Sequence, residues 1–119
     1  MLCLRSGMRI ALIGVTDPAI MHLHGGATLQ ASSMVPLEPV DVIVYQVESP
    51  FALRRVSELS KLVKSRGALW VLWPSNGRHI TANHIERVCT AAGMTGTWEA
   101  SVTGRLSGMK FIHRFADGR

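Results

Sequence analysis

Seven residues of this 119-residue sequence stand at or just after three apolar runs, in a pattern typical of ligand-binding sites. The runs span residues 8–15, 41–47 and 68–73. If they form parallel strands, their carboxyl ends meet at one edge of a sheet, where open α/β sheets bind ligands. The candidate ligand-binding residues are Gly14, Thr16, Asp17, Glu48, Trp73, Ser75 and Asn76.

Trp73 has two interpretations. Its indole can stack on a planar ligand, with Ser75 and Asn76 hydrogen-bonding the same molecule. Alternatively, Trp73 and Trp70 fill the core, and Pro74 ends the strand because it cannot continue the backbone ladder. The run that holds both tryptophans is apolar on both faces, so we favour the second interpretation.

The turn after the first apolar run lacks the pattern of a conventional cofactor site. Dinucleotide and methyl-donor sites need glycines there, so that the backbone can approach the ligand, and an acidic residue after the next strand. Here Gly14 is followed by bulky residues, and Gly25 and Gly26 lie too far along the chain. The sequence therefore predicts no cofactor.

Histidines and a serine suggest two other kinds of chemistry. His22 and His24, with His79 or His84, could supply imidazole ligands to a metal, but no cysteine or carboxylate cluster accompanies them. Ser107 as a nucleophile would need a histidine base, and nothing in the sequence brings a histidine to it. We predict no metal site and no catalytic residues.

The chain is basic, with thirteen Lys and Arg against eight Asp and Glu, and its formal net charge is +5. This balance permits contact with nucleic acid. The best candidates share the polar face of one expected helix: Arg54, Arg55, Lys61 and Lys64. Because the positive residues are otherwise dispersed, we favour ordinary solvated faces over a nucleic-acid surface.

Composition identifies a globular chain. A hydrophobic content of 47% and a charged content of 18% argue against disorder. The apolar runs are too short to span a bilayer, and the first residues lack the apolar region of a signal peptide, so we expect a cytoplasmic protein. Cys3 and Cys89 are expected to be unpaired, inert thiols.

Helical signals lie between the apolar runs. Asp17 and Pro18 can begin a first helix, although two glycines soon interrupt it. Residues 27–35 are ambiguous between a weak helix and a loop. Residues 51–65 carry apolar side chains at helical spacing, and Gly67 suits a left-handed cap for that helix.

The C-terminal part predicts one more helix and a hairpin. Thr81 can cap a helix that Gly93 ends. Two strand-like segments, 97–103 and 109–115, then form an antiparallel hairpin. The predicted fold is a single α/β domain over residues 1–119, a three-layer Rossmann-like sandwich with a mostly parallel sheet and a C-terminal antiparallel hairpin. Residues 1–7 and 116–119 are expected to be tails.

Two segments carry a family resemblance. Residues 67–74 read GALWVLWP and residues 107–114 read SGMKFIHR. In these segments the chain resembles the bacterial domain-of-unknown-function 3052 family, whose members look like GALWVAWPK and WSGLKFVRR. Ser75 stands where members often carry a lysine, and Leu106 where they often carry a tryptophan. Any role of that lysine is therefore lost in this chain.

The order of elements also resembles the C-terminal half of a class I methyltransferase. Residues 41–43 would lie in its fourth strand and residues 67–69 in its fifth. These resemblances imply a methyltransferase-like fold, but the small family brings no established activity.

Three functions fit the sequence. We favour a non-catalytic methyltransferase-like domain that binds a partner protein or itself as a homodimer, since the expected fold has no catalytic residues and the hairpin offers a sheet edge. The alternative is a small-molecule or nucleotide-binding protein that uses the strand-end crevice near Trp73. The second alternative is a nucleic-acid-binding module.

Overall fold

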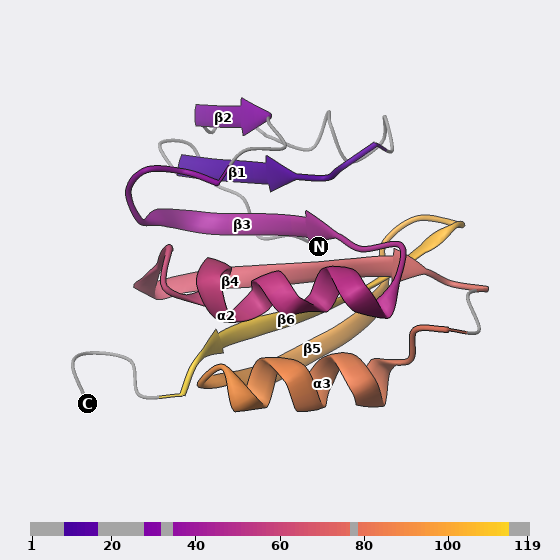
Figure 1. The fold of residues 1–119 in the computed structure, drawn as a ribbon. Coiled ribbons are helices and arrows are strands. Elements are labelled where there is room, and N and C mark those ends of the chain that lie inside the picture. Colours follow the sequence, from indigo (N-terminus) through magenta and orange to yellow (C-terminus); the bar gives the residue numbers. More distant parts are fainter. Residues whose placement is uncertain (1–8, 17–27, 32–34, 77–78, 115–119) are drawn as a thin grey trace.

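The computed structural model of the chain describes residues 9–16, 28–31, 35–76 and 79–114, which form one mixed sheet with helices against it (Figure 1). The strand order is β2-β1-β3-β4-β6-β5. The strands are β1 (Arg9–Ile13), β2 (Thr28–Ala31), β3 (Val40–Gln46), β4 (Val63–Pro74), β5 (Met94–Ser101) and β6 (Leu106–His113). The first four run parallel, and β6 and β5 add an antiparallel hairpin. The α/β fold class and its C-terminal hairpin are confirmed.

The helical segments that the structure describes lie on one face of the sheet (Figure 1). They are the 3-10 helix η1 (Pro50–Arg55), α2 (Val56–Ser60) and α3 (Ala82–Ala91). Their apolar residues pack with the sheet into one core, which includes Ile43, Leu59, Val71, Trp73, Ile85, Cys89 and Phe111. Burial of both faces explains why β3 is apolar from Val42 to Tyr45 and β4 from Ala68 to Trp73.

The opposite face of the sheet is also buried. Its core comprises Ile10, Leu12, Val42, Val44, Trp70, Leu72, Val102 and Leu106. The first helix predicted from the sequence falls within residues 17–27, outside the described residues. The predicted tails, residues 1–7 and 116–119, also lie outside the described residues.

The helix predicted over residues 51–65 is wrong in its second half. It ends at Ser60, and Val63 already begins β4 by pairing with Val40 of β3. Between this pair and the pair Val42–Ala68, β4 contains extra residues that form a bulge. The apolar periodicity continued into the strand because Leu62 and Val63 pack against the same core as the helix.

Gly67 is not the predicted helix cap. It lies in β4, and its φ is not among the positive values found at Gly14 and Gly93. A Cβ here would collide with the backbone oxygen of Asp41 and lie 2.9 Å from Cγ1 of Val63. Glycine is therefore required by the close approach of β4 to β3.

Residues 27–35, predicted as a weak helix or a loop, include a strand instead. β2 pairs in parallel with β1 over residues 28–31 and forms one edge of the sheet. Its sequence Thr-Leu-Gln-Ala is short and carries little strand signal of its own. Pairing with β1 decides its conformation.

Both predicted ends of α3 are confirmed. The Oγ1 atom of Thr81 accepts a hydrogen bond of 3.2 Å from the backbone N–H of His84, which satisfies one free donor of the first turn. Gly93 follows the helix with a φ of 89°. Across the described part of the chain, no helix is both long and apolar enough to cross a membrane.

Candidate ligand-binding site

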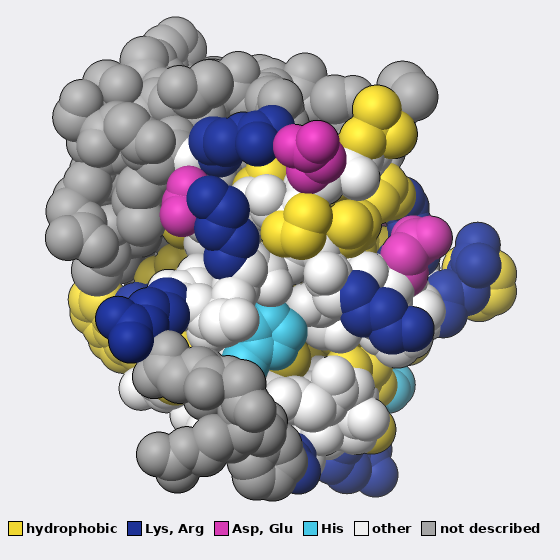
Figure 2. Space-filling model, turned by 90° about the vertical axis from the view of Figure 1, so that its left-hand side faces the viewer, with side chains coloured by type: hydrophobic (Ala, Val, Ile, Leu, Met, Phe, Trp, Pro, Cys, Tyr) yellow, Lys and Arg dark blue, Asp and Glu magenta, His cyan; other side chains and the backbone are white. Residues whose placement is uncertain are grey.

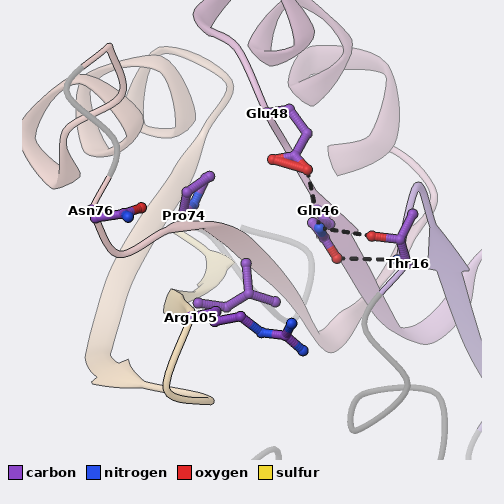
Figure 3. A pocket seen from close by; sticks show the side chains of 7 residues that line it. Thr16, Gln46, Glu48, Pro74, Asn76 and Arg105 are labelled. Carbon is purple, nitrogen blue, oxygen red and sulfur yellow. Dashed lines mark hydrogen bonds between the residues drawn. The ribbon is translucent and has the colours of Figure 1, made fainter.

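A pocket of about 370 Å³ lies at the carboxyl ends of the parallel strands (Figure 3). Its walls come from the segment after β1, the end of β3, the end of β4 and the turn between β5 and β6. The lining residues are Thr16, Gln46, Glu48, Pro74, Asn76, Arg105 and Leu106. This is the edge of the sheet where the sequence predicted a crevice.

Gln46 organises one wall of the pocket. Its side-chain oxygen accepts a hydrogen bond of 3.2 Å from the backbone N–H of Thr16. Its Nε2 donates to Oγ1 of Thr16 at 3.2 Å and approaches Oε1 of Glu48 at 3.5 Å (Figure 3). Because Gln46 is only 8% exposed, these contacts satisfy an amide that would otherwise be costly to bury.

Gly14 allows the chain to turn toward Gln46. Its φ of 68° lies in the left-handed region, and a Cβ would stand 3.1 Å from the backbone oxygen of Gln46. Both observations favour glycine at this position. Gly14 thus shapes the wall without contributing a side chain.

The other wall is fixed by contacts between the end of β4 and the hairpin. The backbone N–H of Ser75 donates to the carbonyl of Arg105 at 2.9 Å. The hydroxyls of Ser75 and Ser107 lie 3.1 Å apart. These bonds hold Asn76 and Arg105 on segments that meet at the pocket.

The structure brings together some of the predicted ligand-binding residues. Thr16, Glu48 and Asn76 line the pocket. Ser75 is not among the lining residues, and Trp73 is only 5% exposed and packs in the helix-side core, as the second interpretation holds. Asp17 lies outside the described residues.

Four of the lining residues were not among the predicted ligand-binding residues: Gln46, Pro74, Arg105 and Leu106. The sequence assigned Pro74 only the role of ending its strand. Gln46 gave a usable signal, since a lone amide at the end of an apolar strand must find hydrogen-bond partners when buried. Arg105 and Leu106 gave none, because their place in the pocket depends on how the hairpin folds back against β4.

Three of the four residues predicted to contact nucleic acid already engage neighbours. The Arg54 guanidinium lies 4.4 Å from the centre of the Phe51 ring. Arg55 pairs with Glu58 at 3.9 Å. Lys64 pairs with Asp41 at 3.6 Å. The fourth predicted residue, Lys61, is exposed.

Positive charge is also dispersed on the side of the molecule opposite the pocket, where the parallel strands begin. Figure 2 faces this side and shows separate Lys and Arg side chains around a histidine, with acidic and apolar side chains between them. Arg9 there pairs with Glu38 at 3.6 Å. The described residues form no continuous basic surface in this view.

The described residues that were considered for metal binding or nucleophilic catalysis do not come together in a site. Among the described residues, no group of three His, Cys, Asp or Glu could hold a metal ion, and His22 and His24 lie outside them. The Ser107 hydroxyl faces Ser75, whereas Nε2 of His113 lies 2.8 Å from the carbonyl of Val63.

Among the described residues, the two groups with shifted pKa values, Tyr45 and Cys89, belong to the core. Burial raises the pKa of Tyr45, against the opposing effect of Arg55 and Arg54, and its hydroxyl donates to the carbonyl of Ala52 at 2.6 Å. Burial raises the pKa of Cys89 to about 12. Neither group lines the pocket, so both shifts are structural.

No family model matches the chain, and neither does any curated protein. Several solved structures are similar to it, however. A ribosomal protein L11 methylase from Lactobacillus delbrueckii subsp. bulgaricus is 12% identical over 95% of this chain and 73% of its own, with a TM-score of 0.65. The chain has a methyltransferase-like Rossmann fold.

Two further structures are similar to this methyltransferase-like domain. A fibrillarin pre-rRNA processing protein from Methanococcus jannaschii is 14% identical over 96% of this chain and 69% of its own, with a TM-score of 0.65. A magnesium protoporphyrin IX methyltransferase from Synechocystis PCC 6803, with bound SAM, is 9% identical over 91% and 71%, with a TM-score of 0.62. Identities this low establish the fold alone.

Proposed function

We propose that this methyltransferase-like domain binds a small polar molecule in the pocket at the carboxyl ends of β1, β3 and β4. The observation that carries the proposal is the pocket itself, whose volume of about 370 Å³ falls in the usual range for small-molecule sites. Hydroxyl, carboxylate, amide and guanidinium groups converge on it from separate segments. Trp73, which could have filled this space, packs on the helix side of the sheet instead.

The ligand need not be a nucleoside. One structurally similar methyltransferase holds SAM, which makes SAM and its relatives a reasonable first class of probes. However, β2 is the strand that follows β1 in the chain and pairs with it, and the sequence after β2, Ser32-Ser33-Met34, contains no acid to bind a ribose. A useful panel therefore combines SAM, S-adenosylhomocysteine, adenosine and AMP with small non-nucleoside metabolites.

A thermal-shift series tests the proposal. A ligand at a hundred times its Kd stabilises the folded state by about 2.7 kcal/mol, so a true ligand should raise the Tm in a concentration-dependent way. The rise should shrink in Glu48→Gln and Asn76→Ala, and it should persist in the matched surface control Lys61→Gln. If no compound moves the Tm at millimolar concentration, the pocket is not a ligand site of this kind.

A second candidate function is association through the edge strand β5. This strand ends the sheet, and its Trp98 side chain is 46% exposed. Trp98 is held in a T-shaped contact with the buried Trp70, with ring centroids 6.0 Å apart. Glu99 is the only charged residue of β5, so the edge carries little of the charge that usually discourages strand pairing.

Light scattering after size-exclusion chromatography tests this association. Pairing of β5 edges predicts a dimer for the wild type and a monomer for Trp98→Lys, because the new charge would have to be buried. Leu37→Lys is the matched control, since Leu37 is 98% exposed and lies away from β5. A wild-type monomer at high concentration would exclude this candidate.

Nucleic-acid binding ranks below both candidates, because the charges predicted to carry it are dispersed and mostly paired. It predicts binding that weakens steeply as salt is raised. Absence of binding at low salt would exclude it.

A further inference from the structure

We infer that the pocket selects a ligand with opposite charges at its two ends, an amine that faces Glu48 and an anionic group that faces Arg105. The inference rests on the proposed small-molecule function and names the chemical class of its ligand. Figure 3 shows Glu48 and Arg105 on opposite sides of the pocket, with Thr16 and Asn76 at its flanks.

The Glu48 side of the pocket suits a positively charged donor. An ionised carboxylate only accepts hydrogen bonds, and an ammonium group both donates them and balances the charge. Gln46 approaches one oxygen of this carboxylate at 3.5 Å, and Glu48 forms no ion pair with any residue that the structure describes. The second carboxylate oxygen can therefore accept from a ligand amine.

Gln46 lies beside that carboxylate. It is nearly buried and tied to the segment after β1 by two hydrogen bonds to Thr16. Its amide oxygen and nitrogen are both engaged in these contacts, so ligand recognition falls to Glu48 and the Thr16 hydroxyl.

The Arg105 side suits an anionic group. A guanidinium carries five N–H donors and no acceptor. Arg105 can therefore bind a carboxylate or phosphate with some of these donors and keep an existing contact with the others. The backbone of Arg105 is anchored to Ser75 through a hydrogen bond of 2.9 Å, so its side chain starts from a fixed point.

The surface between the two charges is partly apolar. Pro74 and Leu106 line it, and Leu106 is only 5% exposed. A ligand that fits this arrangement has an apolar spacer with an ammonium at one end and a carboxylate or phosphate at the other.

A matched set of fragments tests the inference by ligand-observed NMR. The probes are 4-(aminomethyl)benzoate, benzylamine, benzoate and 4-methylbenzyl alcohol, which carry both charges, either one or none on a similar ring. We expect 4-(aminomethyl)benzoate to bind most tightly, with each charge worth up to about fivefold in affinity at a partly exposed site.

Variants assign the two ends separately. Glu48→Gln should remove the preference for the amine and leave that for the carboxylate, and Arg105→Gln should do the reverse. Glu99→Gln and Arg54→Gln make the same charge changes away from the pocket and should leave both preferences intact. Comparable binding of all four probes, unaffected by Glu48→Gln and Arg105→Gln, would overturn the inference but not the proposed function. If none of the probes nor any member of the earlier panel binds, both fail.

Discussion

Gly67 lies where β4 passes close to the backbone of Asp41 in β3, and we expect Gly67→Ala to be strongly destabilising. The added Cβ would meet the backbone oxygen of Asp41, which cannot rotate away as a side chain can. Overpacking of this kind costs about 3 kcal/mol. Urea unfolding should show the loss as a lower midpoint with an unchanged slope.

Gly104→Ala is the matched control for this prediction. No heavy atom lies within 4 Å of a Cβ built at Gly104, and its φ is not in the positive range. Its free energy of unfolding should change by less than about 0.5 kcal/mol. Equal stabilities of the two variants would show that β4 relaxes away from β3 at little cost.

Cys89 should make the stability of the protein depend on pH in the alkaline range. Its pKa rises from 9.0 to about 12 in the folded state because the thiolate would be buried. Between these pH values the unfolded chain releases the thiol proton and the folded chain keeps it. The contribution of Cys89 to the free energy of unfolding is therefore complete below pH 9 and is lost as the pH rises toward 12.

Urea unfolding of wild type and Cys89→Ala at pH 8 and pH 10 measures this effect. All other titratable groups are common to both proteins, so the difference between the two pH dependences isolates Cys89. The wild type should lose more stability than the variant over this interval. Equal losses would mean that the thiol ionises as readily in the folded state as in the unfolded chain.

The candidate site could be predicted from the sequence only in part. Thr16, Glu48 and Asn76 follow strands that were recognisable by composition, and parallel strands must bring their carboxyl ends together. Arg105 could not be placed, because its position depends on hairpin pairing across the sheet. Trp73 was a candidate that the structure places in the core instead. The sequence could not decide this, because only the orientation of β4 determines which face of the sheet the side chain of Trp73 enters.

At the scale of elements, α3 depends on its N-cap. We expect Thr81→Ala to cost about 1 kcal/mol, because the N–H of His84 loses its acceptor. Thr90→Ala near the other end of the helix serves as control, since it removes the same atoms from an exposed position without a cap bond. Equal unfolding midpoints of the two variants would show that water replaces the cap without loss.

Elements were predictable where local chemistry and tertiary packing agree. β3 and α3 combine a matching apolar pattern with clear ends, and both appear close to their predicted positions. The start of β4 was mistaken for helix because Val63 continues the helical period while pairing with Val40. β2 was missed because its few residues depend on β1 for their pairing.

At the scale of the whole molecule, the sheet order distributes stability unevenly. β4 lies between β3 and β6, and it is buried on both faces by two separate cores. β2 and β5 lie at the two edges and are paired on one side only. Local opening should therefore need least free energy at the edges and most at the centre.

Native-state hydrogen exchange tests this distribution. Amides of β4 from Leu69 to Leu72 should exchange only through global unfolding, with free energies equal to that from urea denaturation. Amides of β2 and the outward-facing amides of β5 should exchange through smaller openings. Dimerisation through the β5 edge would protect those β5 amides increasingly as the protein concentration rises. A saturating pocket ligand would instead slow exchange beside Gln46 and Asn76 to the same extent at every protein concentration. The same measurement thus separates the two candidate functions, and a flat profile across β2, β4 and β5 would contradict the predicted order of stability.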